Sequence, residues 1–335
     1  MKVAVTILNW NGKGFLEKFL PSLFNSLQQS KFEADLIIAD NASTDGSAES
    51  FSTNPKIKWI QLDRNYGFTG GYNRAFEKLD GYDYFVLINS DIEVTDGWLD
   101  ILIDFMESHP EASACQPKIL SYANKNQFEY AGASGGFIDK WGFPLCRGRI
   151  LSCVEEDKGQ YDNPQRCFWA SGACMVVRSE AYRKLGGLEE EFFAHMEEID
   201  FCWRASLADG QIWCVPQSKV YHVGGGTLPN NSPRKLYLNY RNNLLMLWKN
   251  LPEKGKNTKI FLRKCIDGLS AVCYIFQGKF SYFRSVVKAH RDYTRLKAKV
   301  TVTPNEKGAL PYGMLPYSII RKFFTGKKRF SQLPF

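Results

Sequence analysis

Five carboxylates stand where a side chain could do chemistry, because each ends or begins a segment with a regular pattern. Asp40 and Asp91 come at the ends of apolar runs, and Glu197, Glu198 and Asp200 open the segment "EEIDFCWRA". A carboxylate at the end of a buried strand can bind Mg²⁺ or Mn²⁺ together with waters and phosphate oxygens, or accept hydrogen bonds from a nucleobase or ribose. An acid at the start of a helix can act as a general base, although it also favours the positive end of the helix dipole.

The elements that must position these acids alternate along the first 110 residues. Apolar runs at 3–8, 34–40, 57–63 and 84–90 predict strands, and the segments between them have the periodicity of helices. Strands separated by helices form β-α-β units, so we expect a mainly parallel sheet flanked by helices. Ligands of such a sheet bind beyond the carboxyl ends of its strands. The polar residues Asn9, Asp40, Asn65 and Asp91 fall at those ends.

The rest of the chain divides into three stretches. Residues 110–170 are rich in Gly and aromatics without a clear period, which predicts an irregular segment of functional use. Strand and helix patterns resume over 167–216, and the chain after residue 232 is helical, basic and aromatic. We therefore predict a first domain over 1–232 and a basic, mainly helical C-terminal extension over 233–335.

Charge is distributed unevenly between these two parts. From Arg234 to the end there are 22 Lys and Arg against 4 Asp and Glu, a net charge of +18, and residues 1–233 carry −10. The basic segments 259–293 and 317–330 mix Lys and Arg with Phe, Tyr, Ile and Leu. This composition suits the surface of an anionic membrane, nucleic acid, or helices that pack on the first domain with solvated charges.

Cysteine usage and hydropathy favour the cytoplasm. The nine cysteines include no C-x-x-C pair, and the N-terminal apolar run is too short for a secretion signal. A reducing compartment with mostly buried thiols is the expected setting. The sequence contains no run of about 18 apolar residues, so no membrane-spanning helix is predicted.

Two of the candidate segments also have simpler interpretations. Asp40 and Ser43 could cap the following helix, and Asp91 could cap the helical pattern "WLDILIDFM". The glycine-rich segment "DRNYGFTGGYNRAF" permits a tight backbone near a phosphate, but it is not G-x-G-x-x-G, so the dinucleotide fingerprint is absent.

Seven motifs in order resemble one family. "VTILNWNG", "IIADNASTDGS", "NYGFTGGYNRAF", "LINSDIEV", "SGACMVVR", "GGLEEEFFAHMEEIDFCWRA" and "VYHVGG" are similar to those of family 2 glycosyltransferases of the GT-A fold. They resemble in particular the bacterial branch that includes rhamnosyltransferases of cell-surface polysaccharide synthesis. The resemblance covers about residues 1–245, and it implies an α/β fold that binds a nucleotide-diphosphosugar.

The resemblance implies a donor site and a metal site. The residues expected to bind the donor are Asn9, Trp10, Asp40, Asn65, Gly67, Asn73, Asn89 and Asp91, with Asn9, Trp10 and Asp40 around the base. The family's D-x-D metal motif is N-S-D here, which leaves Asp91 as the carboxylate ligand of Mg²⁺ or Mn²⁺. His222 matches a histidine that some members use as a further metal ligand.

The resemblance also implies an inverting reaction. The family's base is the second acid of an E-D pair, which stands here as Glu197-Glu198, so Glu198 takes that role. Glu198 would remove a proton from the acceptor hydroxyl as it attacks the anomeric carbon. The acceptor is expected near Trp169, Gly172, Glu197 and Asp200.

The expected partners follow from the same family. The donor would be a UDP- or dTDP-sugar, with dTDP-rhamnose among the candidates, and the acceptor a glycan or a polyprenyl-linked sugar at the inner face of the cytoplasmic membrane. A sugar nucleotidyltransferase would share the sheet and the metal, but no G-x-x-T-R-style loop stands near residue 10. A nucleic-acid binder would use the basic C-terminal part, but the acidic first part carries the ligand-site acids, so no nucleic acid is expected.

Overall fold

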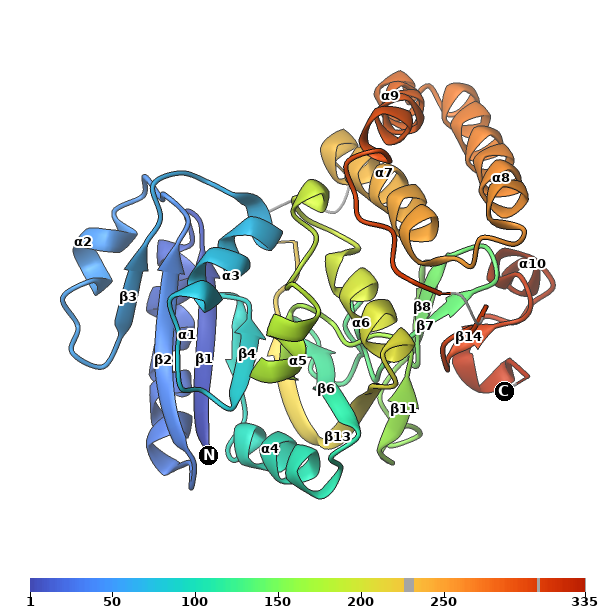
Figure 1. Ribbon diagram of the computed structural model, residues 1–335. Coiled ribbons are helices and arrows are strands. Elements are labelled where there is room, and N and C mark those ends of the chain that lie inside the picture. Colours follow the sequence, from blue (N-terminus) through green and yellow to red (C-terminus); the bar gives the residue numbers. More distant parts are fainter. Residues whose placement is uncertain (226–231, 306–307, 335) are drawn as a thin grey trace.

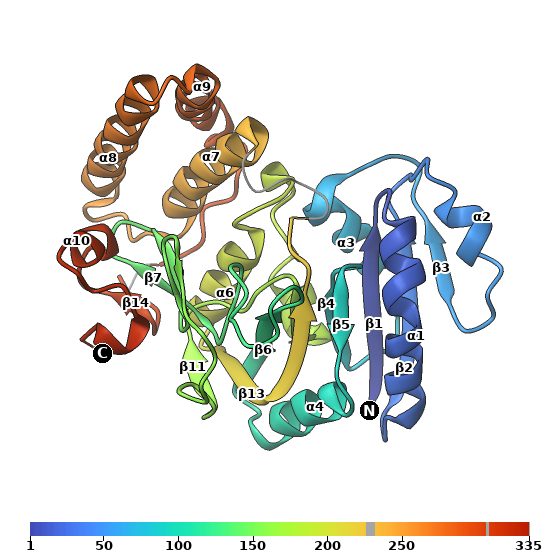
Figure 2. The same cartoon turned by 180° about the vertical axis from the view of Figure 1, so that it is seen from behind.

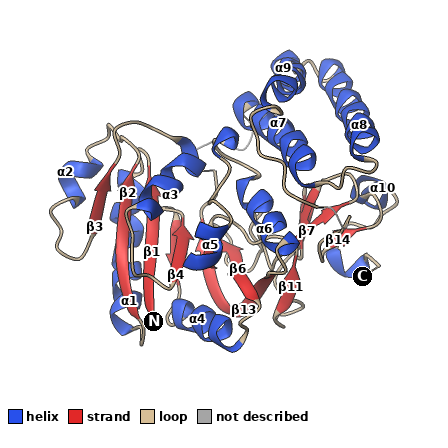
Figure 3. Cartoon of the chain, viewed as in Figure 1, coloured by secondary structure: helices blue, strands red, loops and turns tan. Residues whose placement is uncertain are grey.

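Two β-sheets and the helices around them make up the computed structural model, which describes residues 1–225, 232–305 and 308–334 (Figure 1). Among these residues the larger sheet has nine strands and the smaller has five. Helices lie on both faces of the larger sheet (Figure 3).

The first four strands are parallel and bring their carboxyl ends to one edge. They are β1 (Lys2–Asn9), β2 (Glu33–Asp40), β3 (Lys58–Gln61) and β4 (Tyr84–Ile88), in the spatial order β4-β1-β2-β3. The predicted alternation of strands and helices is confirmed. β4 is buried along its whole length, because β1 pairs with it on one side and β12 (Cys174–Arg178) on the other.

The second half of the large sheet is mixed. It contains β12, β6 (Ala112–Ser121), β13 (Gln211–His222), β11 (Gln165–Cys167) and β5 (Ile92–Val94). β13 runs parallel to β6, whereas β12, β11 and β5 run antiparallel to their neighbours. The end of β13 pairs with β5, so His222 lies next to the strand that follows Asp91.

Alternate strand residues face two separate layers of helices. One layer consists of α1 (Lys13–Gln29) and α4 (Trp98–Ser108), and the other of α3 (Gly67–Glu77), α5 (Ser179–Lys184) and α6 (Glu197–Leu207). In β1, for example, Val3 and Val5 contact the first layer and Ala4 the second. Figure 1 shows α3, α5 and α6 in front of the sheet, and α1 stands in front when the molecule is seen from behind (Figure 2). The short helix α2 (Ser47–Phe51) follows β2.

The stretch 110–170, predicted to be irregular, contains six strands separated by turns and loops. It contains β6 and most of the small sheet, whose strands are β7 (Gly136–Asp139), β8 (Pro144–Cys146), β9 (Arg149–Ile150), β10 (Cys153–Val154) and β14 (Met314–Leu315). β6 was missed because it contains the buried polar residues Gln116 and Lys118 on either side of Pro117. Pro117 cannot donate a ladder hydrogen bond, and β13 has a register shift opposite it.

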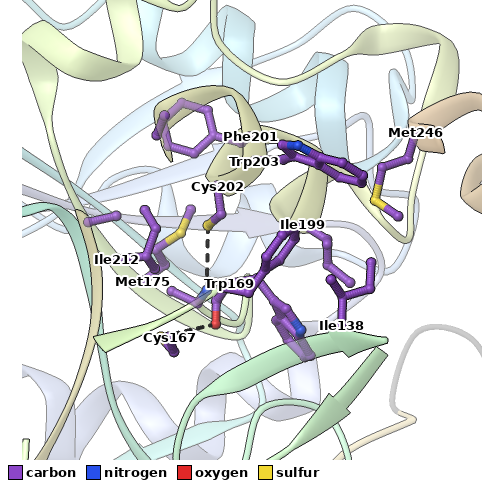
Figure 4. Close-up of a cluster of buried hydrophobic side chains, with 14 of the residues drawn as sticks. Ile138, Cys167, Trp169, Met175, Ile199, Phe201, Cys202, Trp203, Ile212 and Met246 are labelled. Atoms are coloured by element: carbon purple, nitrogen blue, oxygen red, sulfur yellow. Dashed lines mark hydrogen bonds between the residues drawn. The ribbon is translucent and has the colours of Figure 1, made fainter. Parts of the chain in front are cut away.

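Trp169 lies in the core between the two sheets. Its indole nitrogen donates to the Phe137 carbonyl at 3.0 Å, and a Cβ at Gly136 would meet the ring at 2.1 Å. Figure 4 shows its ring among the buried side chains of Ile138, Ile199 and Cys202. Gly136 is therefore required for the sheets to approach each other over this ring.

The C-terminal part begins with three long helices and returns to the small sheet. The helices are α7 (Pro233–Asn250), α8 (Lys256–Phe276) and α9 (Phe280–Leu296), followed by α10 (Ile319–Phe324). β14 joins the small sheet, and Ile319 and Phe330 lie in the same hydrophobic core as the first part. The boundary at 232/233 remains a prediction, but both sides of it share one core.

None of the helices in the described ranges is long and apolar enough to cross a membrane.

Candidate active site

Asp91 and His222 meet at the carboxyl end of the large sheet. Asp91 lies three residues beyond β4, and His222 is the last residue of β13. His222 Nε2 lies 3.1 Å from Asp91 Oδ1, and both side chains are buried. The backbone N–H of Gly224 donates to the other carboxylate oxygen of Asp91 at 3.3 Å. The sequence prediction that these two residues belong to one site is consistent with this geometry.

A second carboxylate lies on the other side of the imidazole. Glu129 Oε2 is 3.6 Å from His222 Nδ1, at ion-pair distance. Burial by itself would lower the pKa of His222, but interactions with Asp91 and Glu129 outweigh it and raise the pKa to about 10. Burial likewise opposes ionisation of Asp91, yet the hydrogen bond from His222 keeps the pKa of that carboxyl below its usual range.

The Asp91–His222 pair fits a divalent ion. Adjacent ligands of an octahedral ion stand about 3 Å apart when each is bound at about 2.1 Å, and the facing oxygen and nitrogen have that separation. A metal-bound histidine commonly has a carboxylate at its other ring nitrogen, which is the place of Glu129. Across the described residues, no three His, Cys, Asp or Glu side chains form a group that could hold a metal by themselves. Further ligands would come from water and a bound phosphate.

The ends of β1 and β2 are tied together around Asp40. Its carboxylate accepts hydrogen bonds from Asn9 Nδ2 at 2.8 Å, the Ser43 N–H at 2.9 Å and Gln61 Nε2 at 3.0 Å. Asp40 and Ser43 do not cap the following helix, because the N-cap of α2 is Gly46 and no side chain caps it. The bond from the Ser43 N–H closes a turn in the loop before α2, and a nucleobase would have to share the Asp40 carboxylate with these partners. Asn9 Oδ1 has no partner among the described residues, and the neighbouring Trp10 is 40% exposed.

Asn41 fixes the loop that leads into α3. Its amide nitrogen donates to Asn65 Oδ1 at 3.1 Å and to the Gly67 carbonyl at 3.0 Å, and its Oδ1 accepts from the Tyr66 N–H at 2.9 Å. Gly67 has φ +72°, and a Cβ there would lie 2.5 Å from the Phe193 ring. Only glycine fits this position, where the loop before α3 touches the loop before α6.

The loop before α6 is strained. Phe193, His195 and Met196 have positive φ values of 64°, 71° and 73°, a conformation that costs on the order of 1–3 kcal/mol for each non-glycine residue. Hydrogen bonds from α7 hold it. Asn242 Nδ2 donates to the carbonyls of residues 192, 194 and 195 at 2.9, 2.8 and 2.7 Å, and Arg241 Nη2 donates to those of 191 and 192.

This loop delivers Glu197 and Glu198 at the start of α6. One carboxylate oxygen of each lacks a hydrogen-bond partner in the described structure. Burial raises the pKa of Glu198 to about 7, and burial together with the charge of Glu198 raises the pKa of Glu197 well above its ordinary value. Glu198 is partly exposed, whereas Glu197 is buried.

Gly172 connects Glu198 to the strand ends. A Cβ at Gly172 would lie 3.6 Å from Glu198 Cβ and 3.2 Å from the Phe68 ring. The next residue, Ala173, accepts the N–H of Asn89 at 2.9 Å, and Asn89 Nδ2 lies 3.4 Å from His222 Nε2. Glu198 and the Asp91–His222 pair are thus linked through one short chain of contacts.

Three predicted site residues have other roles. Both ends of the Asn73 amide are occupied, by Leu188, Tyr182 and Glu190, so it joins α3 to the 186–190 loop and leaves no atom for a donor. Asp200 is buried and accepts hydrogen bonds from Arg204, Lys249 and Asn250, so its carboxylate belongs to a structural ion cluster. Trp169 is enclosed in the core described above.

Sequence reasoning missed Glu129, Asn41 and Asn242. Glu129 lies in the stretch that has no clear period, so nothing in its surroundings pointed to it. Asn41 follows Asp40 directly and its position at a strand end was a usable signal. Asn242 and Asn243 form a polar pair inside an apolar helical pattern, which is a signal for buried hydrogen bonding.

Comparison with known proteins identifies the family. Residues 4–186 match the profile described as Glycosyl transferase family 2. This match spans more than half of the 335 residues, and the chain belongs to that family, as its motifs predicted.

Several relatives are rhamnosyl- or hexosyltransferases. The N-acetylglucosaminyl-diphospho-decaprenol L-rhamnosyltransferase of Mycobacterium tuberculosis is 26% identical over 223 residues, which are 62% of this chain and 71% of the relative. The low-salt glycan biosynthesis hexosyltransferase Agl10 of Haloferax volcanii is 23% identical over 76% of this chain and 80% of its own length. The predicted resemblance to rhamnosyltransferases is confirmed.

Solved structures show the same fold. S. aureus TarS 1–349 in complex with UDP-GlcNAc has a TM-score of 0.56 at 16% identity, covering 91% of this chain and 82% of that one. The mannosyltransferase PcManGT of Pyrobaculum calidifontis, in complex with GDP-Man and Mn²⁺, has a TM-score of 0.53 at 11% identity, with coverages of 88% and 75%. The fold is the GT-A fold, as predicted.

We predict that Asn242→Ala destabilises the protein and reduces its transferase activity, because the loop before α6 is no longer held in place. Loss of the amide removes its hydrogen bonds to three loop carbonyls, of which only that of residue 192 keeps Arg241 as a donor. This loss should lower the free energy of unfolding by about 1–3 kcal/mol. Urea unfolding followed by circular dichroism measures this change. Asn25→Ala, on the exposed face of α1, is the control and should leave stability nearly unchanged. Equal stabilities of the two variants would show that Asn242 does not hold the loop.

Proposed function

We propose that this protein is an inverting, metal-dependent glycosyltransferase that moves a sugar from a nucleotide-diphosphate donor to a glycan or lipid-linked acceptor. The single observation that carries the proposal is the arrangement around Asp91, His222 and Glu198. The Asp91–His222 pair, which suits a divalent ion, lies just beyond β4 and at the end of β13, and a carboxylate with a raised pKa stands across Gly172 from it. An inverting transfer needs these two groups, one for the leaving diphosphate and one for the acceptor.

The donor is proposed to be a UDP- or dTDP-sugar, with dTDP-rhamnose first among the candidates. The relatives that are rhamnosyltransferases favour this sugar, and the structure of TarS holds UDP-GlcNAc. Asn9, Trp10 and Asp40 lie together at the ends of β1 and β2, where the exposed indole could stack on a base and the free Asn9 Oδ1 could accept from it. Asn65, Gly67 and Asn89 would lie beside the rest of the donor.

The cofactor is proposed to be Mg²⁺ or Mn²⁺, held by Asp91 and His222 and oriented through Glu129. The neighbours GalNAc-T7 and PcManGT were solved with Mn²⁺. When bound, the ion would offset the negative charge that grows on the departing diphosphate. The imidazole must lose its proton to become a ligand, so binding of the metal should release a proton.

Glu198 is proposed to be the general base. Its carboxylate takes the proton of the acceptor hydroxyl while the hydroxyl oxygen bonds to the anomeric carbon. The bond from that carbon to the phosphate oxygen breaks on the opposite face, and its electron pair leaves with the diphosphate. Gly172 keeps the space in front of Glu198 open, and burial of the Glu198 carboxyl raises its pKa and therefore its basicity.

The acceptor is proposed to be attached to a membrane lipid and to belong to cell-surface polysaccharide synthesis. The name of the M. tuberculosis relative describes a decaprenol-linked acceptor. A lipid-linked acceptor would bring the protein to the inner face of the cytoplasmic membrane, where the net charge of +18 on residues 234–335 favours anionic headgroups.

Nucleotide binding is the direct test of the donor and metal sites. UDP or dTDP with Mn²⁺ should raise the melting temperature of the wild-type protein, and Asp91→Ala should abolish both this shift and sugar transfer, because it removes the only carboxylate ligand proposed for the ion. Asp96→Ala, an exposed acid before α4, is the control. A folded Asp91→Ala protein with normal Mn²⁺-dependent turnover would rule out the assignment.

Replacement of Glu198 tests the base. Glu198→Gln should leave donor binding nearly intact and reduce kcat about 10²–10⁴-fold, the usual contribution of a positioned base. The wild-type kcat should fall as the pH decreases below about 7, because protonated Glu198 cannot accept a proton, and the variant should lose this dependence. Glu197→Gln is the matched control. If Glu197→Gln loses the activity and Glu198→Gln keeps it, the roles of the pair are reversed.

Glu129 can be tested by metal affinity without any transfer assay. Glu129→Gln keeps the size of the side chain but removes the charge beside His222, so Mn²⁺ affinity should fall about 10–100-fold. Isothermal titration of Mn²⁺ in the presence of UDP measures the change, with Glu156→Gln, an exposed acid farther along the same stretch, as the control. Unchanged affinity in Glu129→Gln would show that this carboxylate does not support the site.

A further inference from the structure

Helix α8 is oriented with its polar residues inward and its apolar residues outward. Arg263 and Asp267 are buried and bonded to each other at 2.8 Å. Arg263 Nη1 also donates to the Trp141 carbonyl at 2.9 Å, and Asp267 Oδ2 lies 3.3 Å from His290 Nε2 of α9. The polar face of α8 is thus the one that binds the rest of the molecule.

The opposite face of α8 is apolar and exposed. At 3.6 residues per turn its residues fall within an arc of about 160° that contains no charged side chain. Leu269 is 69% exposed and Phe276 is 86% exposed. The exposed members of this arc, which we call the α8 outer face, are Phe261, Leu262, Cys265, Leu269, Val272, Cys273, Ile275 and Phe276.

The α8 outer face points away from the molecule. In two opposite views α7 stands between α8 and the large sheet, and α8 forms the outer side of the helical group (Figure 1, Figure 2). A contiguous exposed apolar stripe of this kind on a helix marks a surface that binds another protein or a membrane.

The exposed charges around this face are predominantly basic, and the exposed acid nearest to it in the chain, Glu253, lies just before α8 and is paired with Lys256. Between residues 254 and 291, every charged side chain that is partly or fully exposed is basic, and the one acid, Asp267, is buried against Arg263. The exposed basic residues are Lys254, Lys279, Arg284, Lys288 and Arg291, and Lys259 and Lys264 are partly exposed. A second copy of this chain would bring two positive surfaces together, whereas anionic lipid headgroups would neutralise them.

We propose that the α8 outer face docks the protein on an anionic membrane, with the helix lying in the plane of the interface. The stretch from Phe261 to Phe276 is roughly 22 Å long, too short to cross a bilayer but long enough to rest in its surface. The proposal deepens the proposed function, on which it rests for its biological motive, by naming the surface that would carry the enzyme to a lipid-linked acceptor.

Vesicle flotation of the full-length protein tests this proposal. The vesicles contain either an equimolar mixture of phosphatidylglycerol and phosphatidylcholine or phosphatidylcholine alone, and they carry no donor or acceptor. The wild type should float with the anionic vesicles at low salt and less at high salt. The double substitution Leu269→Gln/Phe276→Gln, which changes no charge, should weaken this binding by at least about 10-fold because it removes two large apolar side chains from the interface.

Leu310→Gln is the matched control, because Leu310 is 58% exposed and lies outside α8, and it should bind as the wild type does. Melting temperatures of all three proteins show that each is folded. Binding of the Leu269→Gln/Phe276→Gln protein to anionic vesicles as strong as that of the wild type would overturn the proposal. So would a wild-type protein that does not bind anionic vesicles, or one that forms a dimer which the double substitution dissociates. Vesicle binding without any nucleotide-dependent thermal shift would instead overturn the proposed function and leave the docking surface intact.

Discussion

The hydrogen bonds from Asn242 to the loop before α6 are the constraint on which the candidate active site depends. Three non-glycine residues of that loop have left-handed backbone conformations, which an isolated chain would leave. The amide group of Asn242, which donates to the carbonyls of residues 192, 194 and 195, prevents this. The Phe193 carbonyl of the same loop also accepts hydrogen bonds from two N–H groups of α3. The start of α3 and the pair Glu197–Glu198 are therefore held against one common segment.

The buried chain Asp91–His222–Glu129 also depends on compensation by a neighbouring group, but here charge is compensated and not backbone strain. The imidazole lies between two carboxylates, and its raised pKa means that in the absence of a metal it can carry a proton whose positive charge offsets part of their negative charge. A divalent ion would replace that proton. With the proposed ion absent, the protonated imidazole would therefore hold the two buried carboxylates in place.

Much of the fold and part of the site could be predicted from the sequence, since strand ends are easy to recognise. The alternation of strands and helices placed Asn9, Asp40 and Asp91 at one edge, and the structure has them there. Roles inside the site were harder to predict, because they depend on which partners occupy a side chain. Asn73 and Asp200 have side chains that could bind a sugar or a hydroxyl group. However, Asn73 bonds to residues more than 100 positions away in the sequence, and Asp200 bonds to residues about 50 positions away. The apolar face of α8 is visible in the sequence, whereas its outward direction is not.

The ion cluster around Asp200 has a consequence for how the chain can be divided. Asp200 of α6 binds Lys249 and Asn250 at the end of α7, on the far side of the boundary predicted from charge. A truncation at residue 232, or a chimaera that exchanges residues 233–335 with those of a relative, would leave a buried carboxylate with Arg204 as its only remaining partner among these three. Residues 1–232 and 233–335 are therefore not interchangeable modules. A functional truncation or chimaera has to keep α7 together with α6, the helix that carries Glu198.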